Sequence, residues 1–175
     1  MKINTLEELS ALVKIYFSDK TKEIKVEEEE ILKKQIKEAI ERIDGSIGKL
    51  KDIALSQLRN YGYLNDYFRG EIKLVKFVCE CLSNEDRVQL VKSYLRSIKT
   101  IEGHTLIISR EHLLIMLDYL PDDLKVKSLT NAQPADLIRI MGEINKMAIN
   151  RKLKKASRKY YQGYYNIFKE VMVNN

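Results

Sequence analysis

Two cysteines and two histidines have the side-chain types that could hold a zinc ion: Cys79, Cys81, His104 and His112. Structural zinc sites typically place two to four residues between paired cysteines and three to five between paired histidines. Here one residue separates the cysteines and seven separate the histidines. We therefore predict no metal site, and we interpret these residues as reduced core cysteines and as packing or surface histidines.

The sequence offers no set of residues for nucleophilic or acid–base catalysis. Such a set needs a base that an orienting group holds in place. The chain has two histidines, no G-x-S-x-G segment and no glycine-rich phosphate loop. The acidic run 27–30 spreads around a helix, which is typical of a solvated first turn and not of a metal site. We expect a protein that is not an enzyme and uses no cofactor, and an unrecognised enzyme ranks last among the alternatives.

The C-terminal end carries the strongest functional signal, a run of cations followed by tyrosines. Over residues 137–175, nine basic residues against two acidic ones give +7, so the rest of the chain sums to about −1 of the total +6. Such asymmetry indicates an acidic partner. The residues predicted to bind nucleic acid or an acidic partner are Arg151, Lys152, Lys154, Lys155, Arg158, Lys159, Tyr161 and Tyr165.

Several partners suit a basic surface that contains tyrosines. Cations can neutralise nucleic-acid phosphates while tyrosines stack on bases or position the backbone. The same cations can face an acidic protein, and a basic amphipathic helix can lie on a membrane. The structural alternative is that the tyrosines pack inward while lysines keep the helix soluble.

The elements that must position these residues are helices. Seven glycines and two prolines are few chain breakers for 175 residues, and apolar residues recur at three- and four-residue steps. We predict an all-α bundle of about six to seven helices, with either one kinked long helix over 26–59 or two helices broken at 44–48. The predicted domains are a helical bundle over 1–120, a linker-like segment over 121–133 and a basic helical region over 134–175.

Local signals predict where several helices begin. Thr5 and Glu8 form a capping box. Ser83 is a helix N-cap followed by acidic residues, and Pro134 suits a first helical turn. Breaks are expected at 60–63 and at Gly103, where a glycine can follow the last helical residue.

Other segments allow more than one interpretation. We expect 105–108 to be a short strand or a buried link, Ser109 to cap the next helix, and 125–127 to be a short strand. A helix-turn-helix over 109–150 is a minor alternative, because its connection is longer than usual. Residues 140–172 are predicted to form one long helix. Its inward-facing stripe comprises Ile149, Leu153, Ala156, Tyr160, Tyr164, Ile167 and Val171.

Two neighbouring segments resemble the helical domain of GINS subunits, the small scaffold proteins of archaeal and eukaryotic replicative helicases. They are LRNYGYLNDYFRGEIKLV (58–75) and LSNEDRVQLVKSYLRSIKTI (82–101). The first is similar to a helix of that family with Leu, Tyr and basic residues on one face. The second is similar to the following helix, which opens with Ser or Thr and a pair of acids. The resemblance implies a non-enzymatic subunit of a four-subunit ring or horseshoe that bridges the helicase and other replication factors.

We therefore expect a scaffold or adaptor subunit of a nucleic-acid-processing assembly, with DNA replication as the process and protein partners in a homo- or hetero-oligomer. The alternative is a transcription or genome-handling factor that binds DNA or RNA directly through its basic C-terminal helix. The N-terminus lacks the apolar core of a signal peptide, and no window approaches 18 apolar residues. Together with reduced cysteines, these features predict a cytoplasmic protein without a membrane span.

Overall fold

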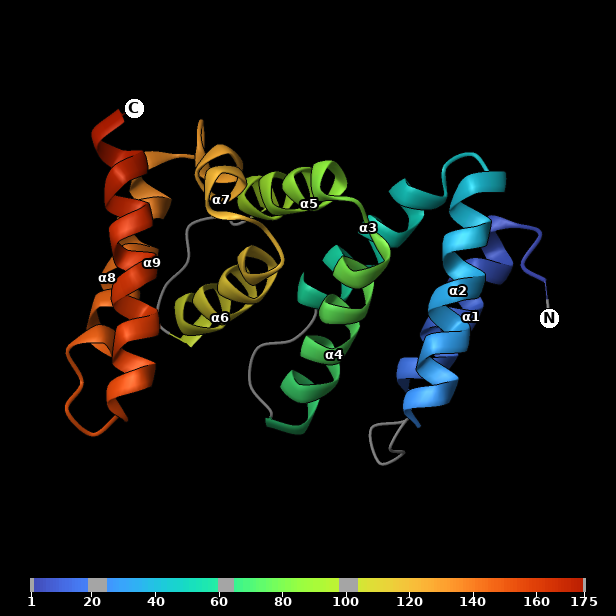
Figure 1. The fold of residues 1–175 in the computed structure, drawn as a ribbon, viewed down its shortest axis with the longest axis horizontal. Coiled ribbons are helices and arrows are strands. Elements are labelled where there is room, and N and C mark those ends of the chain that lie inside the picture. Colours follow the sequence, from blue (N-terminus) through green and yellow to red (C-terminus); the bar gives the residue numbers. More distant parts are fainter. Residues whose placement is uncertain (1, 19–24, 60–64, 98–103, 175) are drawn as a thin grey trace. The chain divides into compact units, whose positions relative to one another are not determined.

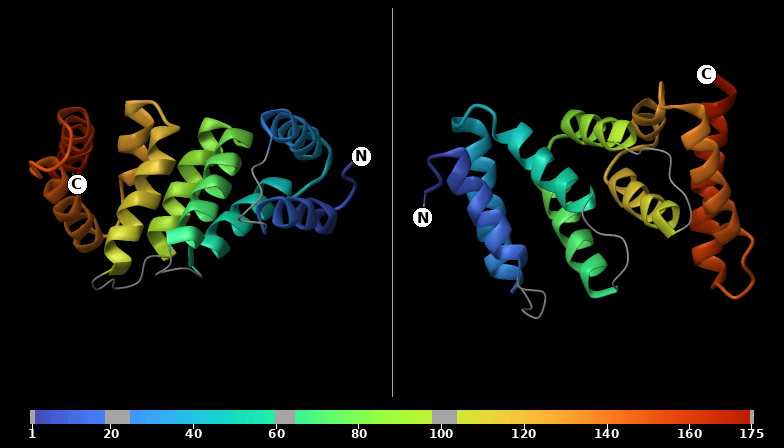
Figure 2. Two further views of the ribbon diagram at one scale, coloured as in Figure 1. Left: turned by 90° about the horizontal axis from the view of Figure 1, so that it is seen from below. Right: turned by 180° about the vertical axis from the view of Figure 1, so that it is seen from behind.

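The computed structural model describes residues 2–18, 25–59, 65–97 and 104–174. Within these ranges, the chain forms helices and no strand (Figures 1 and 2). The helices are α1 (Leu6–Ser18), α2 (Val26–Arg42), α3 (Ser46–Arg59), α4 (Asn65–Cys81), α5 (Asn84–Ser97), α6 (His104–Asp118), α7 (Asp122–Leu129), α8 (Pro134–Ala148) and α9 (Lys155–Asn174). The all-α prediction is confirmed, but six to seven helices were too few, because the described residues hold nine.

The chain divides into two compact units, residues 1–86 and 87–175. In the first unit, α3 contacts α1 and α4, and α2 contacts α4. Each helix buries its apolar stripe, as its three- and four-residue spacing predicts. Fully or almost fully buried side chains include Leu9, Val13, Leu32, Ile36, Ala39, Leu50, Ala54, Val75, Phe77, Val78 and Cys79.

The segment 26–59 forms two helices, so a single kinked helix is not confirmed. The chain turns at Gly45, whose φ of +83° suits glycine because it has no Cβ. The N–H of Ile43 donates to the carbonyl of Ala39 at 2.8 Å. The buried hydroxyl of Ser46 donates to the Ile43 carbonyl at 2.7 Å. These bonds satisfy carbonyls at the end of α2, where no further helical turn can do so.

The helix starts predicted at Thr5, Ser83 and Pro134 are present. The N–H of Glu8 donates to Thr5 Oγ1 at 3.1 Å, while Glu8 Oε2 accepts the N–H of Asn4 at 2.7 Å. The N–H of Asp86 donates to Ser83 Oγ at 3.2 Å. Pro134 occupies the first turn of α8. The breaks expected at 60–63 and at Gly103 lie outside the described residues.

In the second unit, α6 is buried on several sides. The adjacent residues Leu113 and Leu114 and the adjacent residues Met116 and Leu117 are each at most 1% exposed. A helix that is apolar around much of its circumference belongs in the interior. α6 contacts α8, and α9 contacts both α7 and α8. The remaining core of this unit includes Val88, Leu90, Val91, Tyr94, Leu129, Leu137, Ile140, Ile144, Tyr164, Phe168 and Val171.

Three sequence predictions for residues 105–127 are wrong. Residues 105–108 belong to α6, so they are neither strand nor link, and Ser109 lies inside that helix and does not begin it. Residues 125–127 belong to α7 and not to a strand. Short apolar runs do not distinguish strand from helix by periodicity alone. Because α7 lies between α6 and α8, residues 109–150 contain three helices and not the two of a helix-turn-helix.

The segment 121–133 holds α7, whose Ser128 and Leu129 are fully buried. Pro121 precedes the helix, and Asp122 and Asp123 lie in its first turn, where the helix dipole favours negative charge. The predicted division of the chain into domains at this segment stays a prediction. Helix α7, which lies within the segment 121–133, packs on α9.

The prediction of one long helix over 140–172 is wrong. The chain turns over residues 149–154, and α8 and α9 pack side by side as an antiparallel hairpin (Figure 1). The predicted inward stripe is therefore correct only in part. Tyr164 and Val171 are buried, whereas Ile149 is 66% exposed in the turn and Tyr160 is 41% exposed. Phe168 is fully buried and fills the core beside Tyr164.

None of the described helices combines the length with the apolar content that a bilayer crossing requires.

Candidate acidic-partner interface

The turn between α8 and α9 is shaped by Asn150. Its side-chain Oδ1 accepts the N–H of Lys152 at 3.0 Å, and its carbonyl accepts the N–H of Leu153 at 3.1 Å. An asparagine side chain that bonds the backbone two residues on imitates a backbone turn. The chain can therefore reverse here without glycine or proline, and Arg151 and Lys152 lie exposed at the bend.

The predicted cations gather at this end of the hairpin. Arg151, Lys152 and Lys154 lie in the turn, and Lys155 begins α9. Residues at i, i+3 and i+4 share one face of a helix, so Arg158 and Lys159 lie on the same side of α9 as Lys155. We call this group the basic tip: Arg151, Lys152, Lys154, Lys155, Arg158 and Lys159. The structure thus brings all six predicted cations together.

The basic tip has no internal counter-charge. Five of its side chains are exposed and Arg158 is half-buried. Among the described residues, no member of the group forms an ion pair. Arg158 Nε is buried without a hydrogen-bond partner in the described part of the chain. The sequence has no acidic residue between Glu143 and Glu170, so no counter-charge lies next to the tip along the chain.

The position of these cations is unfavourable for helix α9. Helix N-termini carry a partial positive charge, so each cation in the first turn costs roughly 0.3–1 kcal/mol. Like charges at i and i+4, such as Lys155 and Lys159, cost a few tenths more. Helices α2, α5 and α7 follow the opposite rule and carry acids in their first turns, whereas α9 carries none.

Tyr161 is held by groups of α6. Its hydroxyl donates to Glu111 Oε1 at 3.2 Å, and the guanidinium of Arg110 lies 5.8 Å from the ring centre. Arg110 is buried and also pairs with Glu111 at 2.6 Å. Burial and Glu111 raise the pKa of Tyr161, while Arg110 opposes the shift. These contacts leave little of Tyr161 available to a partner.

Tyr165 has different surroundings from Tyr161. It is half-buried, and no described residue forms a hydrogen bond with its hydroxyl. It follows Arg158 by seven residues, which places both on one side of α9. Of the two predicted tyrosines, Tyr165 is therefore the one beside the basic tip with an uncommitted hydroxyl.

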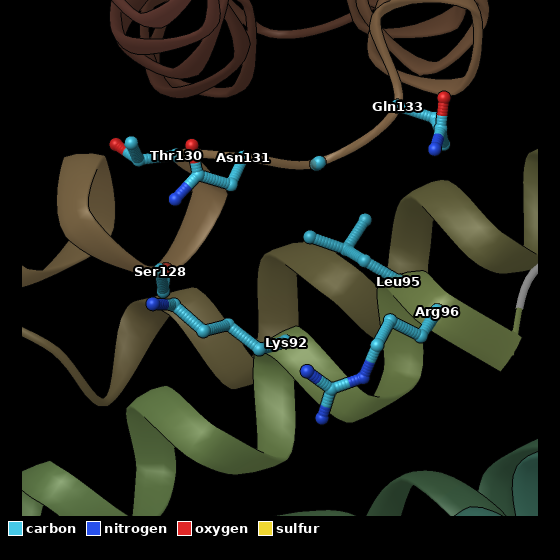
Figure 3. Close-up of a pocket in the computed structure, with 8 residues that line it drawn as sticks. Lys92, Leu95, Arg96, Ser128, Thr130, Asn131 and Gln133 are labelled. Carbon is cyan, nitrogen blue, oxygen red and sulfur yellow. The ribbon is translucent and has the colours of Figure 1, made fainter.

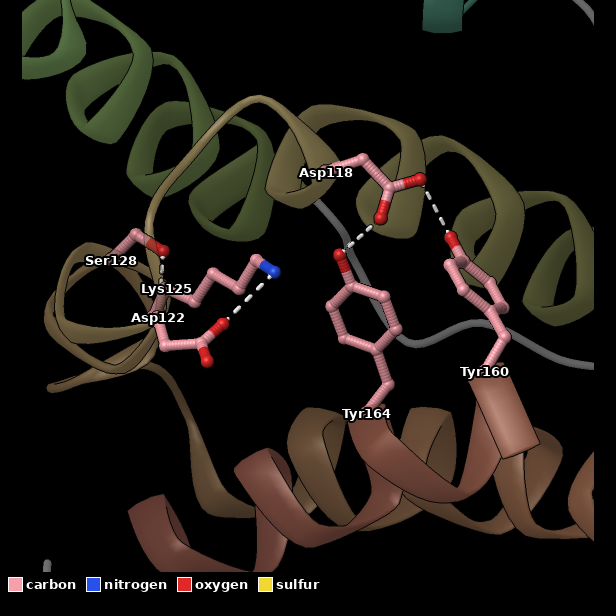
Figure 4. A network of polar contacts seen from close by, with 6 residues as sticks. All are labelled: Asp118, Asp122, Lys125, Ser128, Tyr160 and Tyr164. Atoms are coloured by element: carbon pink, nitrogen blue, oxygen red, sulfur yellow. Dashed lines mark hydrogen bonds and ion pairs between the residues drawn. The ribbon is translucent and has the colours of Figure 1, made fainter.

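Asp118 fixes α9 to the end of α6. Its carboxylate accepts hydrogen bonds from the hydroxyls of Tyr160, at 2.7 Å, and Tyr164 (Figure 4). Burial and the bond to Asp118 raise the pKa of both tyrosines above their ordinary value. Lys125 of α7 lies 5.1 Å from the ring centre of Tyr164 and pairs with Asp122 at 3.1 Å. The two tyrosines are therefore structural, and they hold in place the helix that carries Lys155, Arg158 and Lys159.

The residues whose side chains could bind a metal or act as nucleophiles are core residues where the structure describes them. Cys79 and Cys81 are buried. Burial raises the pKa of Cys81 to about 12, although Lys37 and Lys33 oppose this, so its thiol stays protonated at neutral pH. His112 is 1% exposed, and burial lowers its pKa to about 4. The described residues contain no group of three or more His, Cys, Asp or Glu that could hold a metal ion.

Searches against protein-family models, curated proteins and solved structures find no match for this chain.

The contacts that organise this interface were not recognised from the sequence. Asn150 offered a local signal, since asparagine favours turns, but it stands in a run with helical periodicity. The residues that accept hydrogen bonds from the tyrosines gave no local signal in the sequence. Asp118 and Tyr160 are 42 residues apart, and Glu111 and Tyr161 are 50 apart.

Proposed function

We propose that this chain is a non-enzymatic helical adaptor in a nucleic-acid-processing assembly and that it binds an anionic partner through the basic tip. The observation that carries the proposal is a set of six neighbouring cations without an ion pair in the described residues, placed where helix α9 is destabilised by positive charge. The sequence resemblance of 58–75 and 82–101 to GINS subunits favours DNA replication as the process.

An anionic partner would reverse the energetic cost at the tip. The cations that repel each other and the dipole of α9 in the free protein would each gain an opposite charge on binding. Phosphates or carboxylates would also meet the positive end of the helix, which favours negative charge. Residues kept at some cost to stability are typical of sites selected for function.

The rest of the described structure fits binding better than catalysis. The buried thiol of Cys81 and the buried neutral imidazole of His112 are packed into the core and face no substrate. The tyrosines of α9 that are bonded to Asp118 and Glu111 serve the fold. Further along α9, the exposed amides of Gln162 and Asn166 bond each other at 3.1 Å.

The first test is recovery of partners from the native host with the wild-type chain and with the variant Lys154→Glu, Lys155→Glu. The control variant is Lys14→Glu, Lys127→Glu, which makes the same charge change at exposed positions outside the tip. We expect the same partners for the wild type and the control and their loss with the tip variant. Equal recovery with all three proteins would contradict the proposal.

Direct binding of DNA or RNA is the second candidate function. It is favoured by the run of cations along the turn and the first turns of α9, with Tyr165 on the same side. Nuclease treatment before partner recovery distinguishes the two functions. Partners that survive nuclease are bound by protein contacts, whereas partners that disappear are bridged by nucleic acid.

A further inference from the structure

A pocket of about 240 Å³ lies between α5 and the link from α7 to α8 within the second unit (Figure 3). One wall is formed by Lys92 and Arg96, which are four residues apart and share a face of α5. The other wall is formed by Ser128 and by Thr130, Asn131 and Gln133 of the link. The pocket is built from residues that are more than 30 positions apart in the sequence.

The charge of the lining is +2. Two of its residues are basic and none is acidic. Among the described residues, Lys92 and Arg96 form no ion pair, and Arg96 donates only to the neutral hydroxyl of Ser93, at 3.1 Å. Like charges at i and i+4 repel, so their placement is unfavourable until an anion lies between them and the opposite wall.

The opposite wall supplies neutral donors. The hydroxyls of Ser128 and Thr130 donate to carbonyls of α7, at 2.8 and 2.9 Å, so their hydrogens are already used. The side chains of Asn131 and Gln133 are exposed, and their amides have no hydrogen-bond partner among the described residues. Asn131 also has a φ of +70°, a left-handed conformation that asparagine tolerates better than most residues. Both amides are borne by exposed side chains, which can turn toward an anion held by the two cations.

The size of the pocket limits the anion. Its volume of about 240 Å³ is smaller than the roughly 300–1,000 Å³ of sites for drug-sized ligands. No aromatic side chain lines it, so a nucleobase would have no ring to stack on. The pocket suits a compact dianion with several acceptor oxygens, not a whole nucleotide.

We propose that this pocket binds the phosphate group of a phosphomonoester, with Arg96 and Lys92 on one side and the amides of Asn131 and Gln133 on the other. A guanidinium bonds two phosphate oxygens at once, and an ammonium adds a point charge. The phosphate belongs either to a small molecule or to the end of a polynucleotide. This site is separate from the basic tip and does not depend on the function proposed for it.

The test is calorimetric titration with inorganic phosphate, a nucleoside monophosphate, and a short single-stranded oligonucleotide with and without a 5′-phosphate. We expect Lys92→Gln and Arg96→Gln each to weaken binding about tenfold or more, because each removes a charge-assisted hydrogen bond. Lys127→Gln with Arg139→Gln, at exposed positions outside both the pocket and the basic tip, should bind inorganic phosphate as the wild type does.

The relative affinities for these ligands show which kind of molecule carries the phosphate. Equal affinity for the monophosphate and the phosphorylated oligonucleotide indicates a small-molecule site, whereas tighter binding of the phosphorylated oligonucleotide alone indicates a polynucleotide end. Backbone amide shifts of 130–133 on addition of phosphate provide a measurement on the unmodified chain. Absence of binding by all phosphate ligands, or equal affinity after substitution of Lys92 and Arg96, overturns the proposal.

Discussion

Tyr160 of α9 donates its hydroxyl hydrogen to Asp118 at the C-terminal end of α6, with 2.7 Å between the two oxygens. Tyr164, one turn further along α9, donates to the other carboxylate oxygen of Asp118. The rings of the two tyrosines also pack edge to face, with centres 5.2 Å apart. Because Tyr160 directly follows Lys159, this network fixes the part of α9 that carries the basic tip. The carboxylate of Asp118 therefore stabilises the fold and also positions the helix that carries the candidate interface.

Removal of one tyrosine hydroxyl should destabilise the fold. Tyr164→Phe leaves a buried ring in place but removes a hydrogen bond to a charged acceptor, which is typically worth about 1.5–3 kcal/mol. We expect the free energy of unfolding in urea to fall by that amount. Tyr165→Phe is the matched control, because no described residue bonds the Tyr165 hydroxyl, and it should change stability little. Equal losses for the two variants would show that Asp118 does not stabilise Tyr164.

A lower pH should reduce the free energy of unfolding, because His112 is buried as a neutral imidazole. Burial lowers its folded pKa to about 4 from an ordinary 6.5, so between these values the unfolded chain binds a proton that the folded chain does not. The stability that depends on neutral His112 is complete above about pH 6.5 and is lost as the pH falls toward 4. The loss amounts to about 3 kcal/mol. His112→Leu should remove this component, and the difference between the two stability–pH curves measures it. A constant difference from pH 7 to pH 4 would contradict the assignment.

Two glycines should respond to alanine in opposite directions. Gly142 lies in α8, and a Cβ added there meets no atom within 4 Å. Gly142→Ala should therefore raise the free energy of unfolding by roughly 0.5–1 kcal/mol. Gly45 has a φ of +83°, so Gly45→Ala should destabilise the fold by roughly 1–2 kcal/mol. Thermal unfolding of the two variants gives the signs, and the same sign for both would contradict the turn described between α2 and α3.

The thiol of Cys81 should be unreactive in the folded protein. Its pKa of about 12 leaves almost no thiolate at pH 8, and its side chain is 6% exposed. A coloured disulfide reagent should modify Cys81 slowly in buffer and rapidly in urea. The variant Cys79→Ala isolates the signal of Cys81. Rapid modification without denaturant would show that α4 opens readily at this position.

Local chemistry predicted a good part of this fold from the sequence. Thr5, Ser83 and Pro134 act within one helical turn, so their effects are visible in adjacent residues. The break between α8 and α9 was missed because Asn150 replaces the glycine or proline that usually marks a turn, while apolar residues continue at helical spacing across it. The apolar run 105–108 was misjudged because a helix buried on several sides lacks the one-sided pattern that identifies helices.

Distance along the sequence also decides which parts of the candidate interface could be predicted. The six cations fall within residues 151–159, so their clustering could be predicted. The role of Tyr161 depends on Glu111 and Arg110, and no pattern near Tyr161 indicates them. The phosphate pocket was not predicted either, because Lys92 and Arg96 meet Asn131 and Gln133 only after the second unit has folded.

The most direct test of the basic tip is the salt dependence of binding to duplex and single-stranded DNA. Each phosphate contact contributes about −0.9 to the slope of log affinity against log salt on duplex DNA, so six contacts predict a slope near −5. Lys154→Glu with Lys155→Glu should reduce the magnitude of the slope by about two and weaken binding at every salt concentration, while Lys14→Glu with Lys127→Glu should leave the slope unchanged. Equal slopes for the two variants would contradict DNA binding through the tip, and no binding at low salt would leave an acidic protein as its partner.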